Sequence, residues 1–172
     1  RADHELLAAH GDGLILLTGC LGGEVANELL AGNFRAACDV VDRLRAAVGK
    51  DSVYVEVMDH GIAAQRRIIP DLYRLADELG VKTVVTNDSH YVSQGDAHTH
   101  DALLAVQTGC LLHDNTRFRF NGDGHYVKTA AEMRAVSDDR WWRAGCDSTL
   151  EIVERVAAGG GNSIIPNTAT LP

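Results

Sequence analysis

Short apolar runs alternate with helical patterns along the first half of the chain. The apolar runs cover 14–17, 53–58 and 81–86. Runs of this length and composition are typical of strands buried in a parallel sheet. Between them, apolar residues recur at helical spacing over 24–31, 34–48 and 62–79,. This alternation of strand and helix predicts an α/β protein with parallel strands. Three strands are too few for a closed barrel, so we expect a partial one.

The pattern changes after residue 91. Helices are predicted over about 95–107, 130–136 and 142–156, and the alternating segment 117–120 is predicted to pair with 126–128 across an Asn-Gly-Asp-Gly turn,. This part therefore reads as a mostly helical connector. Pro70 lies inside the pattern of the helix 62–79, where proline is expected to kink or break a helix.

Polar residues follow each predicted strand directly, at 18–20, 58–60 and 87–90. Because ligands bind at the carboxyl ends of parallel strands, we expect this edge of the sheet to be the functional one. Asp88 and His90 are two positions apart in extended chain, so both side chains point the same way. The pair predicts a metal site, although Asn and Asp after a strand are also common turn formers and helix caps.

Other candidate ligands are less clear. Cys20 ends the first strand beside Gly19, where a thiolate can reach a metal, but free cysteine is more often a small buried hydrophobe. Glu56 and His60 lie at or near the end of the second strand and either support the metal ligands or are an ordinary strand glutamate and a solvated loop histidine. His98 and His100 have a His-x-His spacing, but on a helix these side chains diverge too far to share one ion.

Composition narrows the function. The 172 residues are 45% hydrophobic and 23% charged, with a net charge of −8. A domain that holds nucleic acid by its own surface is expected to be basic, so this chain is not an autonomous DNA clamp. Four scattered cysteines predict free thiols in a reducing cytoplasm, and no apolar run is long enough for a membrane span,. Arg1 is an unusual start, which suggests a longer parent protein.

Several segments together resemble one family, the alpha subunit of bacterial DNA polymerase III. They include Leu-Thr-Gly-Cys-Leu-Gly-Gly-Glu at 17–24, Tyr-Val-Glu-Val-Met-Asp-His-Gly at 54–61, Thr-Asn-Asp-Ser-His-Tyr at 86–91 and Tyr-Val-Lys at 126–128. The resemblance extends to about residue 156, in the right order, and is nearest to the actinobacterial type. It implies a division into the C-terminal half of a PHP domain (1–110), a connector toward the polymerase palm (111–156) and a linker (157–172).

The resemblance also implies chemistry. The family's PHP domain is a distorted seven-stranded βα barrel that holds up to three metal ions, usually zinc or manganese, and in some members it is a 3′-to-5′ proofreading exonuclease. Cys20, Asp88 and His90 match its ligand positions, and this ligand set suits zinc. The family's other ligands belong upstream of Arg1, and the magnesium-binding palm belongs beyond the chain. Alone, this chain is expected neither to polymerise nor to proofread.

Two functions remain open at this point. The PHP domain is either an active metal-dependent exonuclease or a scaffold that stabilises the polymerase and docks a separate proofreading subunit. A free-standing phosphatase is disfavoured, because it would not need residues 117–156. Implied partners are DNA and other holoenzyme subunits, including the sliding clamp and a proofreading subunit, with no membrane. Open strand edges also predict aggregation or loose packing of the isolated fragment.

Overall fold

A small parallel sheet forms the centre of the protein. The computed structural model describes residues 3–159, in which three strands lie in the order β1-β2-β3. β1 (Leu16–Leu17) pairs with β2 (Val53–Val57), and β2 pairs with β3 (Thr83–Val85), all in parallel. Every residue of β2 and β3 is buried, as expected of a parallel sheet covered on both faces. The predicted α/β fold, a partial βα barrel followed by a helical connector, is confirmed.

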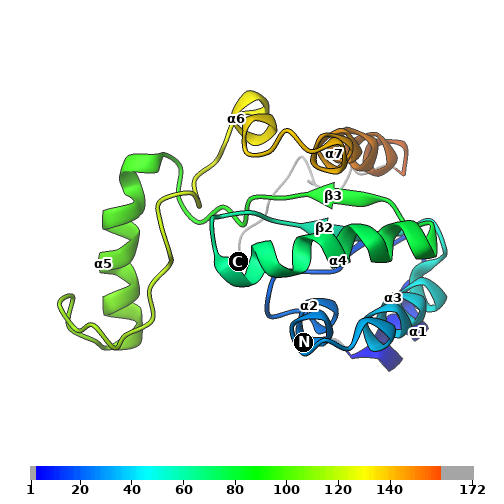
Figure 1. Ribbon diagram of the computed structural model, residues 1–172, viewed down its shortest axis with the longest axis horizontal. Helices are drawn as coiled ribbons and strands as arrows, with labels where there is room; N and C mark the ends of the chain where they lie inside the picture. The colour runs from blue at the N-terminus through cyan, green and yellow to red at the C-terminus, as the bar shows by residue number, and fades with distance from the viewer. Residues whose placement is uncertain (1–2, 160–172) are drawn as a thin grey trace, which may run out of the picture.

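Helices join and cover the strands. They are α1 (His4–His10), α2 (Glu24–Leu30), α3 (Phe34–Val48) and α4 (Ala63–Leu79) before β3, then α5 (Ala97–Thr108), α6 (Ala130–Ala135) and α7 (Arg140–Ala158) after it, with a 3-10 turn at Gln94–Asp96. Figure 1 shows the sheet between α4 and α7, and α3 and α4 both pack on β2. One cluster of buried apolar side chains spans the strands and α2, α3, α4 and α7. The sheet therefore has a single core.

The helix α4 runs unbroken through Pro70, so the predicted break is wrong. Proline removes only one backbone hydrogen bond from a helix, and burial of its apolar face offsets that loss. Ile68 and Leu72, on either side of Pro70, are both buried in the core. The helix ends at Gly80 in the left-handed conformation, with φ of 61°, as glycine at this position predicts.

The predicted hairpin between 117–120 and 126–128 is wrong. Within the described residues, Tyr126 forms an isolated parallel bridge with Tyr91 instead. Residues 117–120 do not form a strand. The Arg117 side chain is instead buried and forms an ion pair with Asp101 of α5. Tyr126 therefore pairs with the segment that follows β3, at Tyr91, and not with residues 117–120.

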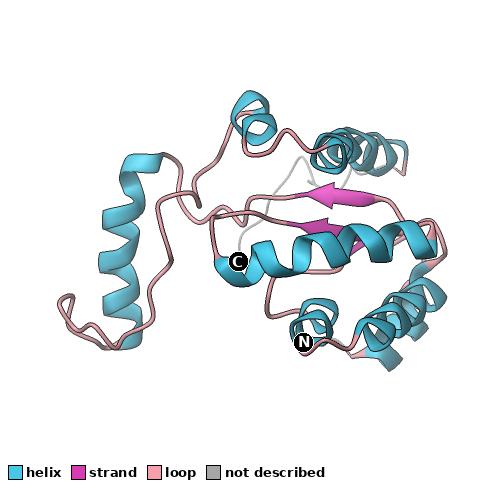
Figure 2. Cartoon of the chain, in the orientation of Figure 1, coloured by secondary structure: helices cyan, strands magenta, loops and turns pink. Residues whose placement is uncertain are grey.

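The helix α5 projects from the layered body of the molecule. Figures 1 and 2 show it beyond the ends of the strands, joined to the body by loops on both sides. Leu103 and Val106 on this helix are 61% and 79% exposed. In residues 3–159, no helix combines the length and the hydropathy needed to cross a bilayer.

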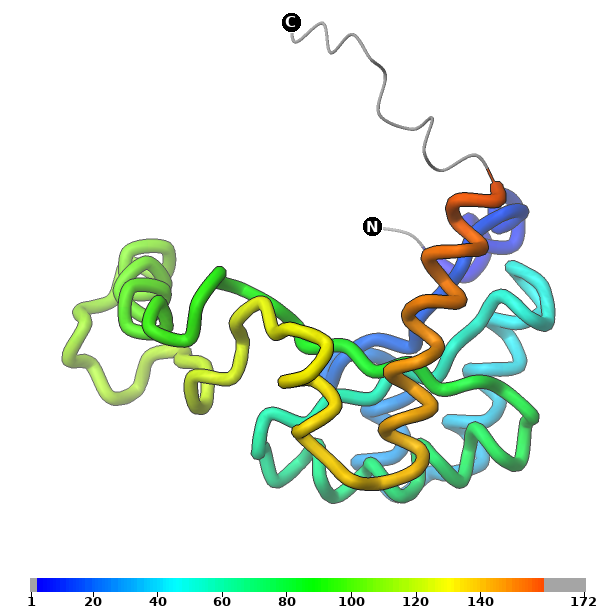
Figure 3. Tube along the Cα trace, turned by 90° about the horizontal axis from the view of Figure 1, so that it is seen from above, coloured from blue at the N-terminus to red at the C-terminus, as the bar shows by residue number. Residues whose placement is uncertain are grey.

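The connector belongs to the same core as the sheet. The helix α7 packs on β3 and crosses the sheet in Figure 3. Its residues Trp142 and Cys146 are buried in the main apolar cluster. The predicted linker begins inside this helix, which continues to Ala158, and residues 160–172 lie outside the described part. The boundaries at 110 and 156 stay predictions.

Close packing of α7 on β3 depends on Gly145. A Cβ atom at this position would lie 2.7 Å from Cγ2 of the buried Val85. Alanine normally stabilises a helix by about 1 kcal/mol relative to glycine, but the clash reverses the sign. We expect Gly145→Ala to lower the free energy of unfolding by about 1–3 kcal/mol, measured by urea unfolding. The control Gly95→Ala, whose Cβ meets no atom within 4 Å, should change little, and equal effects would contradict this packing.

Candidate metal centre

The carboxylate of Glu56 ties together the loops that follow β1 and β3. Glu56 is buried, and it accepts hydrogen bonds from the Gly19 backbone N–H at 2.9 Å and from the Thr86 hydroxyl at 2.6 Å. The Thr18 hydroxyl accepts a bond from the Glu56 backbone N–H at 2.9 Å. Glu56 thus fixes the positions of the two loops that carry the predicted ligands, and it supports these loops rather than facing solvent.

Asp88 and His90 lie where β3 gives way to a loop. Asp88 has φ of 47°, the one left-handed non-glycine residue in the described part of the chain, and aspartate tolerates this conformation better than most residues. The two side chains remain 38% and 35% exposed. His90 Nδ1 lies 2.6 Å from the Asp88 backbone oxygen. Because a carbonyl only accepts, Nδ1 donates, which leaves the Nε2 lone pair of neutral His90 free to bind a metal.

A third residue, His125, joins this pair and was not predicted. Ligand atoms of Asp88, His90 and His125 all lie within 4.8 Å of one another. His125 is 2% exposed, and neither ring nitrogen has a well-formed hydrogen bond to any described residue. Its pKa is lowered, chiefly because burial disfavours the charged ring and secondarily because His60 is close, while the Asp88 backbone and carboxylate act in the opposite direction. A buried, neutral imidazole with unused nitrogens is therefore present.

His60 packs against His125, and both of its ring nitrogens form hydrogen bonds. Its Nε2 lies 2.7 Å from the Asn87 backbone oxygen and donates to it, while Nδ1 accepts from the Gln65 amide at 3.0 Å. The ring stacks on His125 with centroids 4.0 Å apart. This arrangement fits a role for His60 in supporting the residues around the candidate metal ligands.

The loop that carries His125 is fixed to the end of β3. The His90 backbone N–H donates to the His125 oxygen at 2.7 Å. The Asn87 amide donates to the oxygens of Gly124 and Tyr126 at 3.0 and 2.6 Å. Lys128 donates to the Asn87 side-chain oxygen at 2.9 Å and also to Gly124, and burial lowers the pKa of this ammonium group. These bonds hold a residue distant in sequence beside Asp88 and His90.

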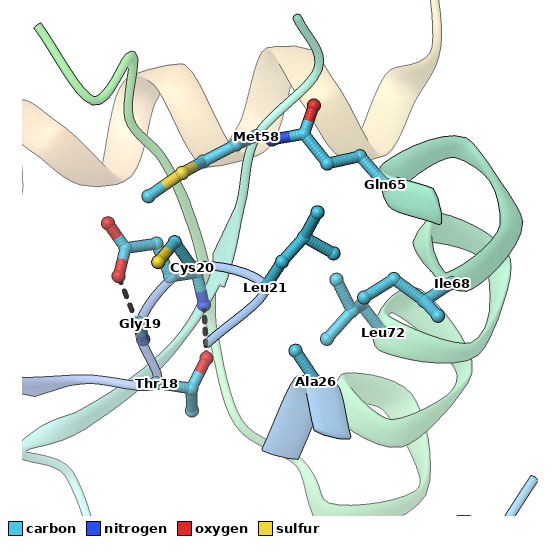
Figure 4. A pocket seen from close by; sticks show the side chains of 10 residues that line it. Thr18, Gly19, Cys20, Leu21, Ala26, Met58, Gln65, Ile68 and Leu72 are labelled. Atoms are coloured by element: carbon cyan, nitrogen blue, oxygen red, sulfur yellow. Dashed lines mark hydrogen bonds between the residues drawn. The ribbon is translucent and has the colours of Figure 1, made fainter. Parts of the chain in front are cut away.

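Cys20 lies outside this group of three. Its side chain is exposed and lines a small cavity, of about 20 Å³, at the end of β1. Figure 4 shows this cavity between the turn at Thr18–Leu21, Met58 and side chains of α4. Gln65 lines the same cavity and forms a hydrogen bond with His60. It therefore links the cavity at Cys20 to the residues that pack on His125. The role of Cys20 as a ligand stays a prediction.

Aromatic rings surround the exposed side of the centre. The His90 ring lies 4.4 Å from Phe120 and 5.5 Å from His100, measured between centroids. Phe120 also contacts His125 at 4.7 Å. His98 is exposed on α5 and does not belong to the three-residue group.

The three side chains fit a divalent metal ion. Atoms bound to one tetrahedral zinc ion at about 2.0–2.2 Å lie roughly 3.3–3.6 Å apart, so ligand atoms that lie within 4.8 Å of one another would have to close around the ion when it binds. Two imidazoles and a carboxylate are ligands that zinc and related metals accept. A metal bound to His125 would also satisfy one of its two unpaired, buried ring nitrogens,.

Comparison with known proteins places the chain in a family. The PHP domain model matches residues 1–60. The DNA polymerase III subunit alpha of Mycobacterium tuberculosis is 47% identical over 156 residues, which cover 91% of this chain and 13% of the relative. The chain belongs to the DNA polymerase III alpha-subunit family. The chain thus spans about an eighth of the length of such relatives.

Other alpha subunits match over a similar share of this chain. The DNA polymerase III subunit alpha of Mycobacterium leprae is 45% identical over 91% of this chain and 13% of the relative. The subunit of Thermus aquaticus is 38% identical over 88% of this chain and 12% of the relative. The higher identity of the mycobacterial alpha subunits agrees with the expected actinobacterial type. Asp88, His90 and His125 lie beyond the 60 residues matched by the PHP model.

Proposed function

We propose that this chain is the metal-binding C-terminal part of a PHP domain in a DNA-directed DNA polymerase, and that the centre serves 3′-to-5′ hydrolysis of DNA. One observation carries the proposal: Asp88 and His90 converge at the carboxyl end of β3 in a chain of the alpha-subunit family. A divalent ion, zinc or manganese, would polarise the phosphoryl group and make water a better nucleophile. Asp88 and His90 would hold this ion, and Cys20, outside their group, would be a ligand of another ion in the same centre.

The residues of the chain position the metal ligands and leave the site open to substrate. Glu56 and His60 fix the loops that carry the ligands, so the ligands are held before substrate arrives,. The exposure of Asp88 and His90, at 38% and 35%, leaves an open side where a terminal phosphodiester can approach. With a net charge of −8, this segment does not attract DNA by its own field, so other parts of the parent protein must deliver the strand end.

Partners and location follow from the same family relationship. We expect DNA, the sliding clamp and a proofreading subunit as partners of the parent polymerase, and the cytoplasm as its compartment. A palm site that uses magnesium for nucleotidyl transfer would lie in another part of that protein. The segment described here contributes to proofreading and not to polymerisation.

Excision of a mismatched 3′ nucleotide tests the proposal. The complete polypeptide that carries this sequence is compared with its His90→Ala variant on a primer with a 3′ mismatch, with primer extension measured in parallel. We expect His90→Ala to lose excision by two or more orders of magnitude, since metal activation of water is lost, while extension continues. His98→Ala, an exposed histidine outside the group, is the matched control. Equal excision by wild type and His90→Ala would contradict the catalytic proposal.

A scaffold role is the second candidate, and an exposed apolar face favours it. Leu14 just before the edge strand β1, Leu17 in β1 and Val156 on α7 are 43%, 40% and 46% exposed. All three line one cavity of about 380 Å³. Such a face suits packing against another part of the polymerase. Loss of primer extension on replacing Leu17 by Asp, with no excision activity in wild type, would support the scaffold over the exonuclease.

A further inference from the structure

His125 is the buried titratable group that the family resemblance does not assign. It is 2% exposed, with neither ring nitrogen in a regular hydrogen bond to residues 3–159. An unpaired buried polar group costs about 1–3 kcal/mol, so its retention beside Asp88 and His90 needs a reason. We propose that His125 is a third protein ligand of the same metal ion, so that Asp88, His90 and His125 form a site within this segment. The inference rests on the proposed function only for the presence of a metal.

The neighbouring histidines leave this role to His125. His90 uses Nδ1 to donate to the Asp88 carbonyl and presents Nε2. His60 uses both nitrogens, one on the Asn87 carbonyl and one on the Gln65 amide. Its ring then lies flat against His125, at 4.0 Å between centroids and 16° between planes. His60 thus restricts the plane of a ring whose nitrogens are unpaired.

The backbone holds His125 at the site whether or not an ion is bound. The His90 and Tyr91 backbone N–H groups lie 2.7 and 3.4 Å from the His125 oxygen, and Val127 donates to the Tyr91 oxygen at 3.1 Å. Asn87 anchors both flanking residues of His125 through its amide. The third ligand is therefore attached to the same strand end as the first two, which keeps the ordering cost of binding low.

The ligand set selects the kind of metal. Two imidazoles and one carboxylate, with a buried side at His125 and an exposed side at Asp88 and His90, resemble zinc sites that keep one position open. Magnesium and calcium prefer oxygen ligands and are disfavoured here. The site would take zinc, or manganese with lower affinity. Cys20, outside the group, is free to serve another ion or none.

Zinc binding tests the proposal without reference to catalysis. In the complete polypeptide, zinc affinity is measured by competition with a chromogenic chelator for wild type, His125→Phe and His125→Cys. We expect His125→Phe, which keeps the stack on His60, to weaken one zinc equivalent by more than the roughly 10–100-fold that loss of an outer-shell partner costs. His125→Cys restores a ligand and should recover part of the affinity. His113→Phe, an exposed histidine, is the control and should bind as wild type.

A second measurement needs no variant, so it remains valid if the His125 variants fail to fold. In wild-type protein with ¹⁵N-labelled histidine, zinc should shift a ring nitrogen of His125 together with that of His90. A His90 shift without a His125 shift, or unchanged affinity in folded His125→Phe, would overturn the inference and leave the proposed function standing. If wild type binds no zinc or manganese at all, the proposed function fails as well, so the two failures are distinguishable.

Discussion

Replacing Asp88 by Asn is expected to abolish most metal binding at the end of β3. Asparagine keeps the size of the side chain and tolerates the left-handed backbone, φ of 47° at this residue,. The change therefore removes a negative charge and an anionic oxygen while the loop geometry is retained. Because the charged oxygen contacts the ion directly, the affinity should fall by more than about 100-fold, the upper range for loss of an outer-shell partner.

Equilibrium dialysis against zinc, followed by metal analysis, measures this effect. Asp77→Asn makes the same chemical change at an exposed position on α4 and should leave binding unchanged. A comparison of the two variants separates a local ligand effect from the change in net charge. Equal zinc content in wild type and Asp88→Asn would remove Asp88 from the list of ligands and would require another explanation for its backbone conformation.

The largest loss of stability is expected from Trp142→Ala. Trp142 is 2% exposed, packs in the main core between α7 and the sheet, and donates from Nε1 to the Met133 backbone oxygen at 2.8 Å. Truncation leaves a cavity and removes one of the two hydrogen bonds that the Met133 oxygen accepts, the other coming from the Val136 backbone N–H. Substitutions of this type cost about 3–5 kcal/mol, which is a large share of the 5–15 kcal/mol that stabilises a typical domain.

Thermal and urea unfolding, followed by circular dichroism, measure that loss. Trp142→Phe keeps most of the apolar contact and removes only the hydrogen bond, so it should cost clearly less than Trp142→Ala. Trp141→Ala provides a second comparison, because Trp141 is only partly buried against the core. If Trp142→Ala and Trp141→Ala were equally stable, α7 would not be anchored to the sheet by Trp142.

The strands and most helices could be predicted because their signals are local. Continuous apolar runs marked β2 and β3, glycine marked the end of α4, and Thr129 marked the start of α6, where it forms a capping box with Glu132. Asp88 and His90 converge as expected, but Asp88 is left-handed in a loop rather than extended, so the extended geometry assumed for the pair is wrong. The break expected at Pro70 is absent because the packing on both sides of it, which keeps α4 intact, is a tertiary effect.

His125 could not be predicted because its position depends on contacts between distant residues. The Asn-Gly-Asp-Gly sequence before it favoured a local hairpin, yet Tyr126 pairs with Tyr91. In the same region the Asn87 amide donates to the Tyr126 oxygen and Arg117 is buried against Asp101, and no local pattern reveals either contact. A histidine directly after a turn carries no ligand signal of its own. Glu56 was noted from its place in β2, but its bonds to two loops required the structure.

Crystallography with anomalous scattering at the zinc absorption edge tests the central claim most directly. The complete polypeptide is crystallised with zinc, and an anomalous map is calculated from data on both sides of the edge. We expect a peak in contact with Asp88 and His90, with His125 as a third ligand. Absence of a peak at the end of β3, while zinc occupies other positions, would contradict the claim that this segment carries a metal centre.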